Sequence, residues 1–256
     1  MSHHPLPSAA RSRVRSLLAR PWLGLPALVT VVFLVHALPP YLGLDPAEAR
    51  IPVPDRAPPF YYPLLVVHIF LGAIALTTAC LQVWPRLRAR RPAVHRWSGR
   101  LYVMAVLPAG AAVLAIAPYL AMGPNQQVGS GLLAVLWMAA TVLGYRAARR
   151  RDFTRHREWM VRSFALAFAI VVNRPWLTLC LAVFAPEVLT GARPDMEMLR
   201  QAVGVSLWLS WVVNLIAAEL WLDRLRARRR HAGAAAPAAR AESVHATSAQ
   251  PAGERA

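Results

Sequence analysis

The stretch YYPLLVVHIFLGAIALTTACLQVW, residues 61–84, contains no aspartate, glutamate, lysine or arginine. An α-helix needs about 20 consecutive apolar residues to cross the hydrocarbon core of a bilayer, so this stretch predicts a transmembrane helix. Five further stretches of similar character run over residues 22–38, 101–122, 128–148, 159–184 and 202–222. The sequence therefore predicts an all-α fold, a polytopic membrane bundle of six transmembrane helices.

Arginine accounts for all 29 lysine-plus-arginine positions, and it clusters at alternate ends of the apolar stretches. Short loops with many positive charges stay on the cytoplasmic side of a membrane. The arginine-rich segments, residues 11–20, 86–100, 146–162 and 224–230, all fall on one side of a six-span topology. The loops on the opposite side hold only Arg50, Arg56, Arg193 and Arg200, and more acidic residues than basic ones. We predict a multi-pass protein of the cytoplasmic (cell) membrane with both termini in the cytoplasm.

The formal net charge of +17 would suggest nucleic-acid binding in a soluble protein. Here the positive charge lies at the ends of apolar helices, where each arginine gains about 1 kcal/mol from anionic lipid headgroups. We therefore expect anionic lipids on the cytoplasmic side as partners, and no nucleic acid. The chain divides into a basic cytoplasmic segment (1–20), a six-helix transmembrane domain (21–230) and a cytoplasmic tail (231–256) whose composition predicts disorder.

Several polar side chains lie within the predicted spans, at a depth where a charge is costly unless it is paired or functional. His68 and Arg174 fall in the outer halves of the second and fifth spans. Arg174 either bonds to backbone carbonyls freed by Pro175, or faces His68 across a buried pocket for an anionic or carbonyl-bearing ligand. Asn214 and Glu219 lie in the last span, where we expect Glu219 to form a structural salt bridge near the cytoplasmic end. Its candidate partners are Arg100, Arg162 and His156.

Two similar segments lie at the cytoplasmic starts of the third and fifth spans, HRWSGRLY at residues 95–102 and HREWMVRS at residues 156–163. Each starts with His-Arg, follows an arginine-rich loop and carries another arginine four or five residues after the first. On a helix, His95 shares a face with Tyr102, and His156 shares a face with Ser163. The arginines of the two motifs are Arg96, Arg100, Arg157 and Arg162.

Three uses of this pair of histidines are open. Helix N-termini with several arginines bind anions such as lipid phosphate. Imidazoles from two helices can instead ligate a haem iron, with arginines neutralising the haem propionates. Histidine also transfers protons, because it titrates near physiological pH. Spacings typical of other metal sites, such as His-x-x-x-His or paired cysteines, do not occur in the sequence.

The chain resembles the prokaryotic membrane proteins catalogued as domain of unknown function 2306. The resemblance covers about residues 61–223 and rests on His68-Ile69, on the 87–102 stretch with its His-Arg and Gly-Arg pairs, and on residues 156–163. The same pattern includes Arg174, Trp211, Asn214 and Glu219. The family's activity is not established, so the resemblance implies a five-helix core, here with an added first helix, and it marks residues without implying a function.

The histidines make a membrane redox or quinone-linked protein the leading hypothesis. In it, His68, His95 or His156 ligates haem b, and Arg174 and the motif arginines orient charged groups, with a quinone or a redox protein as partner. The chief alternative is a small-molecule or proton-coupled transporter whose pathway is lined by His68, Arg174 and Glu219. A non-catalytic membrane protein, whose polar residues only hold the helices together, is a third interpretation.

Overall fold

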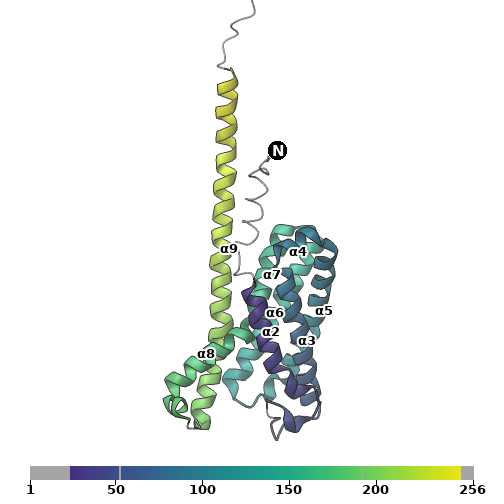
Figure 1. Ribbon diagram of the computed structural model, residues 1–256, viewed down its shortest axis with the longest axis vertical. Coiled ribbons are helices and arrows are strands. Elements are labelled where there is room, and N and C mark those ends of the chain that lie inside the picture. Colours follow the sequence, from purple (N-terminus) through teal and green to yellow (C-terminus); the bar gives the residue numbers. More distant parts are fainter. Residues whose placement is uncertain (1–23, 52, 192, 249–256) are drawn as a thin grey trace, which may run out of the picture.

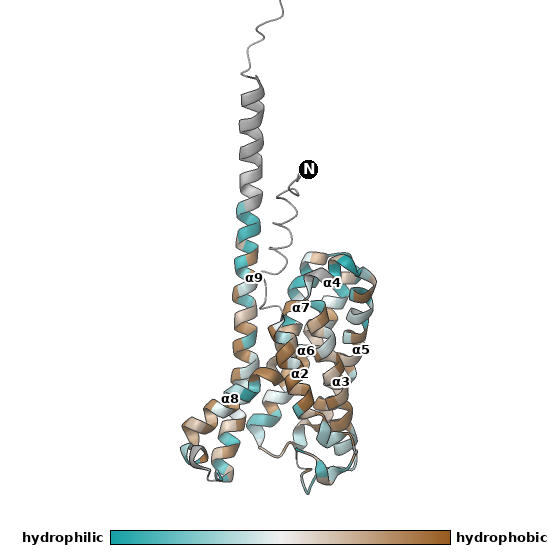
Figure 2. Cartoon of the chain, viewed as in Figure 1, coloured by the Kyte–Doolittle hydropathy of each residue, from teal (hydrophilic) through white to brown (hydrophobic). Residues whose placement is uncertain are grey.

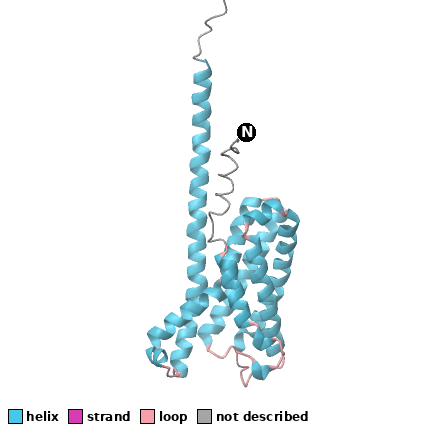
Figure 3. Ribbon diagram, viewed as in Figure 1, coloured by secondary structure: helices cyan, strands magenta, loops and turns pink. Residues whose placement is uncertain are grey.

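A computed structural model describes residues 24–51, 53–191 and 193–248. These residues form helices joined by loops, with no strand among them (Figure 3), so the predicted all-α architecture is confirmed. The longer helices are α2 (Leu25–Ala37), α3 (Tyr61–Gln82), α5 (Pro92–Ile116), α6 (Pro124–Arg149), α7 (Phe153–Ala167), α8 (Ala169–Phe184) and α9 (Met196–Ser248). The short ones are η2 (Pro39–Tyr41), η3 (Pro46–Glu48), α4 (Pro85–Arg90), η4 (Ala117–Tyr119) and η5 (Pro186–Thr190).

Helices α3, α5, α6 and α7 form a four-helix core (Figure 1). α3 packs along α5, α5 along α6 and α6 along α7, and α7 also contacts α3. α5 and α7 therefore lie on a diagonal of the core. The neighbouring helices approach closely at small residues: a Cβ atom on Gly110 of α5 would lie 2.5 Å from Cγ of Met138 on α6.

The fifth predicted span is broken in the structure. α7 ends at Ala167, α8 begins at Ala169, and the two helices are bent by 42°. The apolar pattern predicts one helix over residues 159–184, because hydropathy does not register a change of helix direction. Pro175 lies inside α8, about two turns beyond the break. α8 turns away from the core and packs against α9 (Figure 1).

Four described helices are long and apolar enough to cross a membrane: α3, α5 continued by η4, α6, and the Met196–His231 part of α9. Counting the bent pair α7 and α8 as one span gives a fifth. α2 packs against α3 and α8, but its 13 residues extend only about 20 Å, short of the roughly 30 Å of a hydrocarbon core. The structure thus shows four or five candidate spans where the sequence predicts six.

The predicted terminal segments are only partly described. The basic segment 1–20 and residues 249–256 lie outside the described ranges. Over residues 231–248 the structure differs from the predicted disordered tail, because α9 continues as a helix to Ser248. Alanine has the highest helix propensity, so an alanine-rich stretch readily extends a helix that packing has already started.

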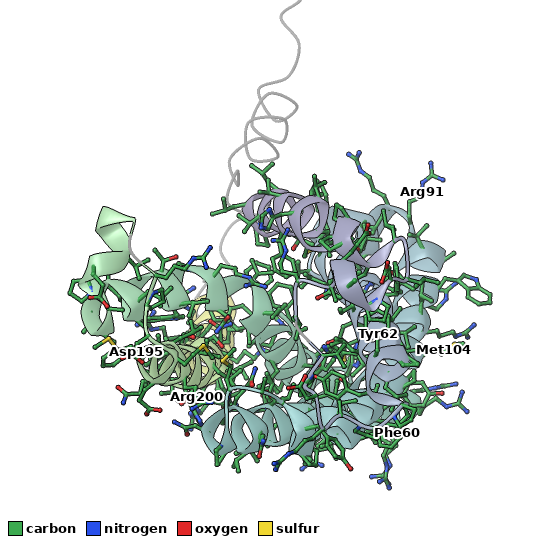
Figure 4. All side chains as sticks on the ribbon, turned by 90° about the horizontal axis from the view of Figure 1, so that it is seen from below. Phe60, Tyr62, Arg91, Met104, Asp195 and Arg200 are labelled. Carbon is green, nitrogen blue, oxygen red and sulfur yellow. The ribbon has the colours of Figure 1, made fainter. Side chains whose placement is uncertain are left out.

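Charged residues separate to the two ends of the bundle. Arginines gather where α4 meets the start of α5 and where α6 turns into α7, and Figure 2 shows this end, named here the arginine end, as polar. At the opposite end, Figure 4 shows Asp195 and Arg200 at the start of α9. Between the ends the outer surface is apolar, as at Met104, which is 70% exposed and points away from the bundle (Figure 4). An apolar belt between two polar ends is typical of a surface that faces lipid.

Four buried side chains close a circuit of hydrogen bonds, named here the hydroxyl circuit, in the middle of the core. The indole N–H of Trp137 donates to Oη of Tyr102 (3.0 Å), which lies 2.6 Å from Oγ of Ser163. Ser163 Oγ lies 2.7 Å from Oγ1 of Thr141, whose hydroxyl donates to the backbone carbonyl of Trp137 (2.8 Å). In this order each hydroxyl donates once and accepts once. Tyr102 and Ser163 thereby join α5 to α7 across the diagonal.

Tyr102→Phe should destabilise the fold, because it leaves the Trp137 N–H and the Ser163 hydroxyl short of a partner in a buried place. We expect the free energy of unfolding in mixed detergent micelles to fall by about 1–3 kcal/mol. Tyr145→Phe is the matched control, since Tyr145 is 43% exposed. Equal effects of the two substitutions would show that the hydroxyl circuit does not stabilise the core.

Candidate functional site

His95 lies in the first turn of α5, which is fixed against the end of α3. Pro92 begins the helix, where its missing N–H is not needed, and the amide of His95 bonds to the carbonyl of Arg91 (3.2 Å). The side chain of Gln82 on α3 donates to the carbonyl of His95 (2.8 Å) and to Oγ of Ser98 (2.5 Å). The ring of His95 is half-buried, and its Nδ1 is a buried atom with no hydrogen-bond partner among the described residues.

His156 occupies the corresponding place at the start of α7. Arg151 adopts a left-handed conformation (φ 60°) and Asp152 caps α7 by accepting from a backbone N–H of its first turn (3.0 Å), so the chain reverses sharply after α6. Nδ1 of His156 bonds to the carbonyl of Gly144 on α6 (2.9 Å). Glycine permits this close approach, because a Cβ atom at Gly144 would lie 2.8 Å from Sδ of Met160. Both the position and the tilt of the His156 ring are therefore set by backbone groups.

The two histidines lie at the same end of the core, on diagonal helices. His95 is seven residues before Tyr102 and His156 is seven residues before Ser163, the two residues that meet in the hydroxyl circuit. Seven residues are two helical turns, about 10 Å, so both histidines follow the inward faces of α5 and α7 toward the arginine end. His156 is accordingly close enough to His95 to interact with it electrostatically. We call these two residues the histidine pair.

His68 lies apart from the histidine pair. Its Nδ1 bonds to the carbonyl of Ala109 on α5 (3.1 Å), which ties α3 to α5. Gln82, at the arginine end of the same helix, is fourteen residues further along, or roughly 20 Å. His68 therefore belongs to the other half of the bundle.

Arg174 is not brought to His68. It is exposed on α8, where its guanidinium lies 5.7 Å from the centre of the Phe33 ring on α2. Its electrostatic neighbours are Arg50 and Tyr41, both from the segment that follows α2. The pocket between Arg174 and His68, one of the two alternatives for Arg174, gains no support from these contacts, because α8 bends away from the core and lies against α2.

Besides the ion pair between Arg226 and Glu158 (2.8 Å), two polar contacts tie α9 to α7. Glu219 forms a bidentate salt bridge with Arg162, with Nε–Oε1 at 2.5 Å and Nη2–Oε2 at 2.9 Å. Arg162 is thus the partner among the three that the sequence leaves open. The side-chain amide of Asn214 donates to the carbonyl of Ala165 on α7 (3.0 Å). Both contacts cross between the helices, so each favours packing of α9 on α7.

The other three motif arginines make no ion pair within the described part of the chain. Arg100 lies over the ring of Trp97 at 5.1 Å, and Arg157 lies over Trp221 at 5.3 Å. Arg96 is exposed and is an electrostatic neighbour of His95. These three side chains can meet an anionic group near the arginine end, whereas Arg162 is already engaged.

The geometry restricts the chemistry that the site can perform. Among the residues described, no group of three or more histidine, cysteine, aspartate or glutamate side chains could hold a metal ion. A haem iron needs only two axial ligands from the protein, and the histidine pair offers two ring nitrogens. His68, Arg174 and Glu219, which would line a transport pathway, lie at the α3–α5, α2–α8 and α7–α9 contacts respectively.

Several residues that shape the site were not selected from the sequence. Trp137 and Thr141 complete the hydroxyl circuit, and Gln82 holds the first turn of α5. The seven-residue spacing from each histidine to Tyr102 or Ser163 was a usable signal. No pattern in the sequence, however, indicates that α6 supplies the remaining two members of the circuit.

Long apolar helices between polar ends define the chain as a helical membrane protein. The family described as "Predicted membrane protein (DUF2306)" matches residues 65–222, and the chain belongs to this family. The match runs from α3 to the polar part of α9, so it includes the histidine pair and leaves α2 outside. No curated protein and no solved structure matches the chain.

Glu219→Gln tests the contact between α7 and α9. It leaves the charge of Arg162, whose side chain is only 16% exposed, without a carboxylate partner. We expect the free energy of unfolding to fall by about 1–3 kcal/mol. The control is Glu197→Gln, because its 3.9 Å contact with Arg200 is exposed and should contribute less than about 1 kcal/mol. A loss no larger than that of the control would mean that the Arg162 contact is not structural.

Proposed function

We propose that the chain crosses the bacterial cytoplasmic membrane six times, with both termini in the cytoplasm. The gathering of arginines at one end of the bundle supports this orientation, because positively charged short loops are retained on the cytoplasmic side. Six crossings require the apolar stretch that contains α2 to act as a span in addition to α3, α5, α6, the α7–α8 pair and α9. In this topology the histidine pair faces the cytoplasmic side.

We further propose that the protein is a membrane redox protein in which the histidine pair ligates the iron of haem b. The observation that carries this proposal is that His95 and His156 lie at one level of a four-helix core, on diagonal helices. Cofactor sites in helical bundles are built from side chains of facing helices that project into the core.

The hydrogen bonding of the rings also favours ligation. His156 uses Nδ1 to bond to the Gly144 carbonyl, so Nδ1 carries the proton and Nε2 keeps its lone pair. Histidines that bind metals commonly donate their other ring N–H to a backbone carbonyl in this way. His95 has a buried Nδ1 without a hydrogen-bond partner in the described residues, so this ring nitrogen is free to bind the iron. His68 also bonds to a backbone carbonyl, but it lies in the other half of the bundle. We therefore do not propose His68 as a ligand of the iron.

The residues around the histidine pair suit the negative charge of haem propionates, but the helices there would have to move apart to admit a porphyrin. Arg96 is an electrostatic neighbour of His95, and Arg100 lies one turn further along α5; both can neutralise propionates, while Arg162 is held by Glu219. Met160 and Gln82 occupy space against α6 and α5 at this end, so the starts of α5 and α7 must separate around a porphyrin. A bound haem would accept and release one electron there, with a quinone or a redox protein as the exchange partner.

An absorption spectrum tests this assignment. Protein purified in detergent from haem-replete cells should show a Soret band that shifts when dithionite is added. His95→Ala and His156→Ala should each abolish or shift the band, because each removes one axial ligand. His68→Ala is the matched control, since it removes a half-buried histidine of the same bundle and should leave the band in place.

Two outcomes would contradict the haem assignment. One is the absence of a Soret band in the unaltered protein, and the other is an unaltered band in both His95→Ala and His156→Ala. The first outcome would favour the interpretation in which the polar residues only hold the helices together.

Cysteine labelling tests the orientation. In a chain with Cys80→Ala and Cys180→Ala, a single cysteine is placed at Arg90 of α4 or at Asp195 before α9, both of which are exposed. A membrane-impermeant maleimide should label the cysteine at 195 in intact cells, and the cysteine at 90 only after the membrane is opened. The reverse pattern would invert the topology.

A further inference from the structure

An open groove runs along the seam between α7 and α9, on a different side of α7 from the histidine pair. It has a volume of about 240 Å³, and its walls include Val161 and Phe164 of α7, Phe168 at the break between α7 and α8, and Ala217 and Trp221 of α9. The rings of Phe164 and Phe168 stack with their centres 5.4 Å apart. The walls are therefore almost entirely apolar.

Few polar groups line the groove. Its one amide, Asn214, donates to the backbone carbonyl of Ala165. A polar molecule would find little to bond to there, whereas a hydrocarbon chain would bury apolar surface on both walls. The small side chain of Ala217 leaves the width that such a chain needs.

The same seam continues toward the arginine end and becomes cationic. Arg157 lies one turn before Val161 on the groove face of α7, and its guanidinium lies 5.3 Å from the ring centre of Trp221. A smaller hollow next to the groove is lined by Arg157 and Arg229, with Thr154 and Leu225 among its other walls. The seam is therefore apolar along its length and positive at its mouth.

Positive charge exceeds negative charge at the mouth, because the hollow is lined by Arg157, Arg226 and Arg229 and by a single carboxylate, Glu158. Arg226 takes up the nearby carboxylates, with contacts of 2.8 Å to Glu158 and 2.8 Å to Asp223. Arg157 and Arg229 have no carboxylate within ion-pair distance in the same part of the chain, and they are close enough to repel each other. An anion placed between them would remove this repulsion.

We propose that the α7–α9 seam is a binding site for one anionic phospholipid. An acyl chain lies in the groove between Phe168 and Trp221, and the phosphate lies between Arg157 and Arg229. The charge at the mouth selects an anionic headgroup, and the apolar walls require an acyl chain. Bound lipid would contact both α7 and α9, beside the Arg162–Glu219 salt bridge, and so would add to the contact between these helices. This site is independent of the haem proposal, since it uses neither His95 nor His156.

The test measures binding of defined lipids to the full-length protein in detergent by native mass spectrometry. Phosphatidylglycerol should bind at least about tenfold more tightly than phosphatidylcholine of the same chain length, because each arginine at a surface contributes about 1 kcal/mol toward an anionic headgroup. Glycerol phosphate, which has the headgroup charge without acyl chains, should not bind at the same concentrations. Binding of glycerol phosphate as tight as that of phosphatidylglycerol would overturn the acyl-chain part of the site.

Two kinds of variant separate the headgroup from the chain. Arg157→Gln with Arg229→Gln should abolish the preference for phosphatidylglycerol, whereas Arg149→Gln with Arg150→Gln, the matched control for charge at the same end, should retain it. Ala217→Phe fills the groove and should weaken binding of both lipids. The site is refuted if the control pair loses as much preference as the Arg157 and Arg229 pair, or if Ala217→Phe leaves both affinities unchanged. The Soret band should persist in Ala217→Phe and in the Arg149→Gln with Arg150→Gln pair, so a failure of the lipid site in these variants leaves the haem proposal standing.

Discussion

The hydroxyl circuit fixes how α5, α6 and α7 are aligned in the core. Trp137 supplies its first donor, and the carbonyl of the same residue supplies its last acceptor, so Tyr102, Ser163 and Thr141 form a closed set. Hydroxyl groups in an apolar interior must find partners, because each unsatisfied buried group costs about 1–3 kcal/mol. The bond from Tyr102 to Ser163 therefore sets the axial alignment of α5 relative to α7.

That alignment has a consequence at the arginine end. Because His95 and His156 each lie two turns from a member of the bonded pair, fixing Tyr102 against Ser163 also brings the two histidines to one level. Gln82 and the carbonyl of Gly144 then hold the helix starts that carry them. Outside the four-helix core, the 42° bend after α7 moves α8 away and leaves the α7–α9 seam open along one side. The histidine pair and the groove thus arise from different features of the fold.

The sequence predicts the helices well and their breaks poorly. Apolar length identifies the ends of α3 to within two residues and those of α6 to within four. α5 begins at Pro92, nine residues before its apolar stretch, since a helix can extend beyond the membrane core. The bend at Phe168 has no glycine or proline at the break to mark it. α2 is shorter than its apolar stretch in the part that is described.

Predictions for the site residues divide along similar lines. The two histidine motifs are visible as repeated patterns, and their placement on inward helix faces follows from spacing alone. The interaction partner of each arginine could not be predicted, because it depends on which helices become neighbours. Hence the engagement of Arg162 by Glu219, and of Arg174 by the Phe33 ring, required the tertiary structure. The roles of Trp137 and Thr141 in the hydroxyl circuit were not predicted, because an apolar stretch does not indicate which of its polar atoms will be buried.

A double-mutant cycle between Tyr102 and Ser163 measures most directly whether α5 and α7 are joined across the core. The free energies of unfolding of Tyr102→Phe, Ser163→Ala and the double variant are compared with that of the unaltered protein in the same micelles. If the two hydroxyls bond as described, the sum of the losses in the two single variants should exceed the loss in the double variant by about 1 kcal/mol. The reason is that the second substitution cannot remove a bond that the first has already broken. Losses that add within about 0.3 kcal/mol would contradict the diagonal contact, and with it the alignment of the histidine pair.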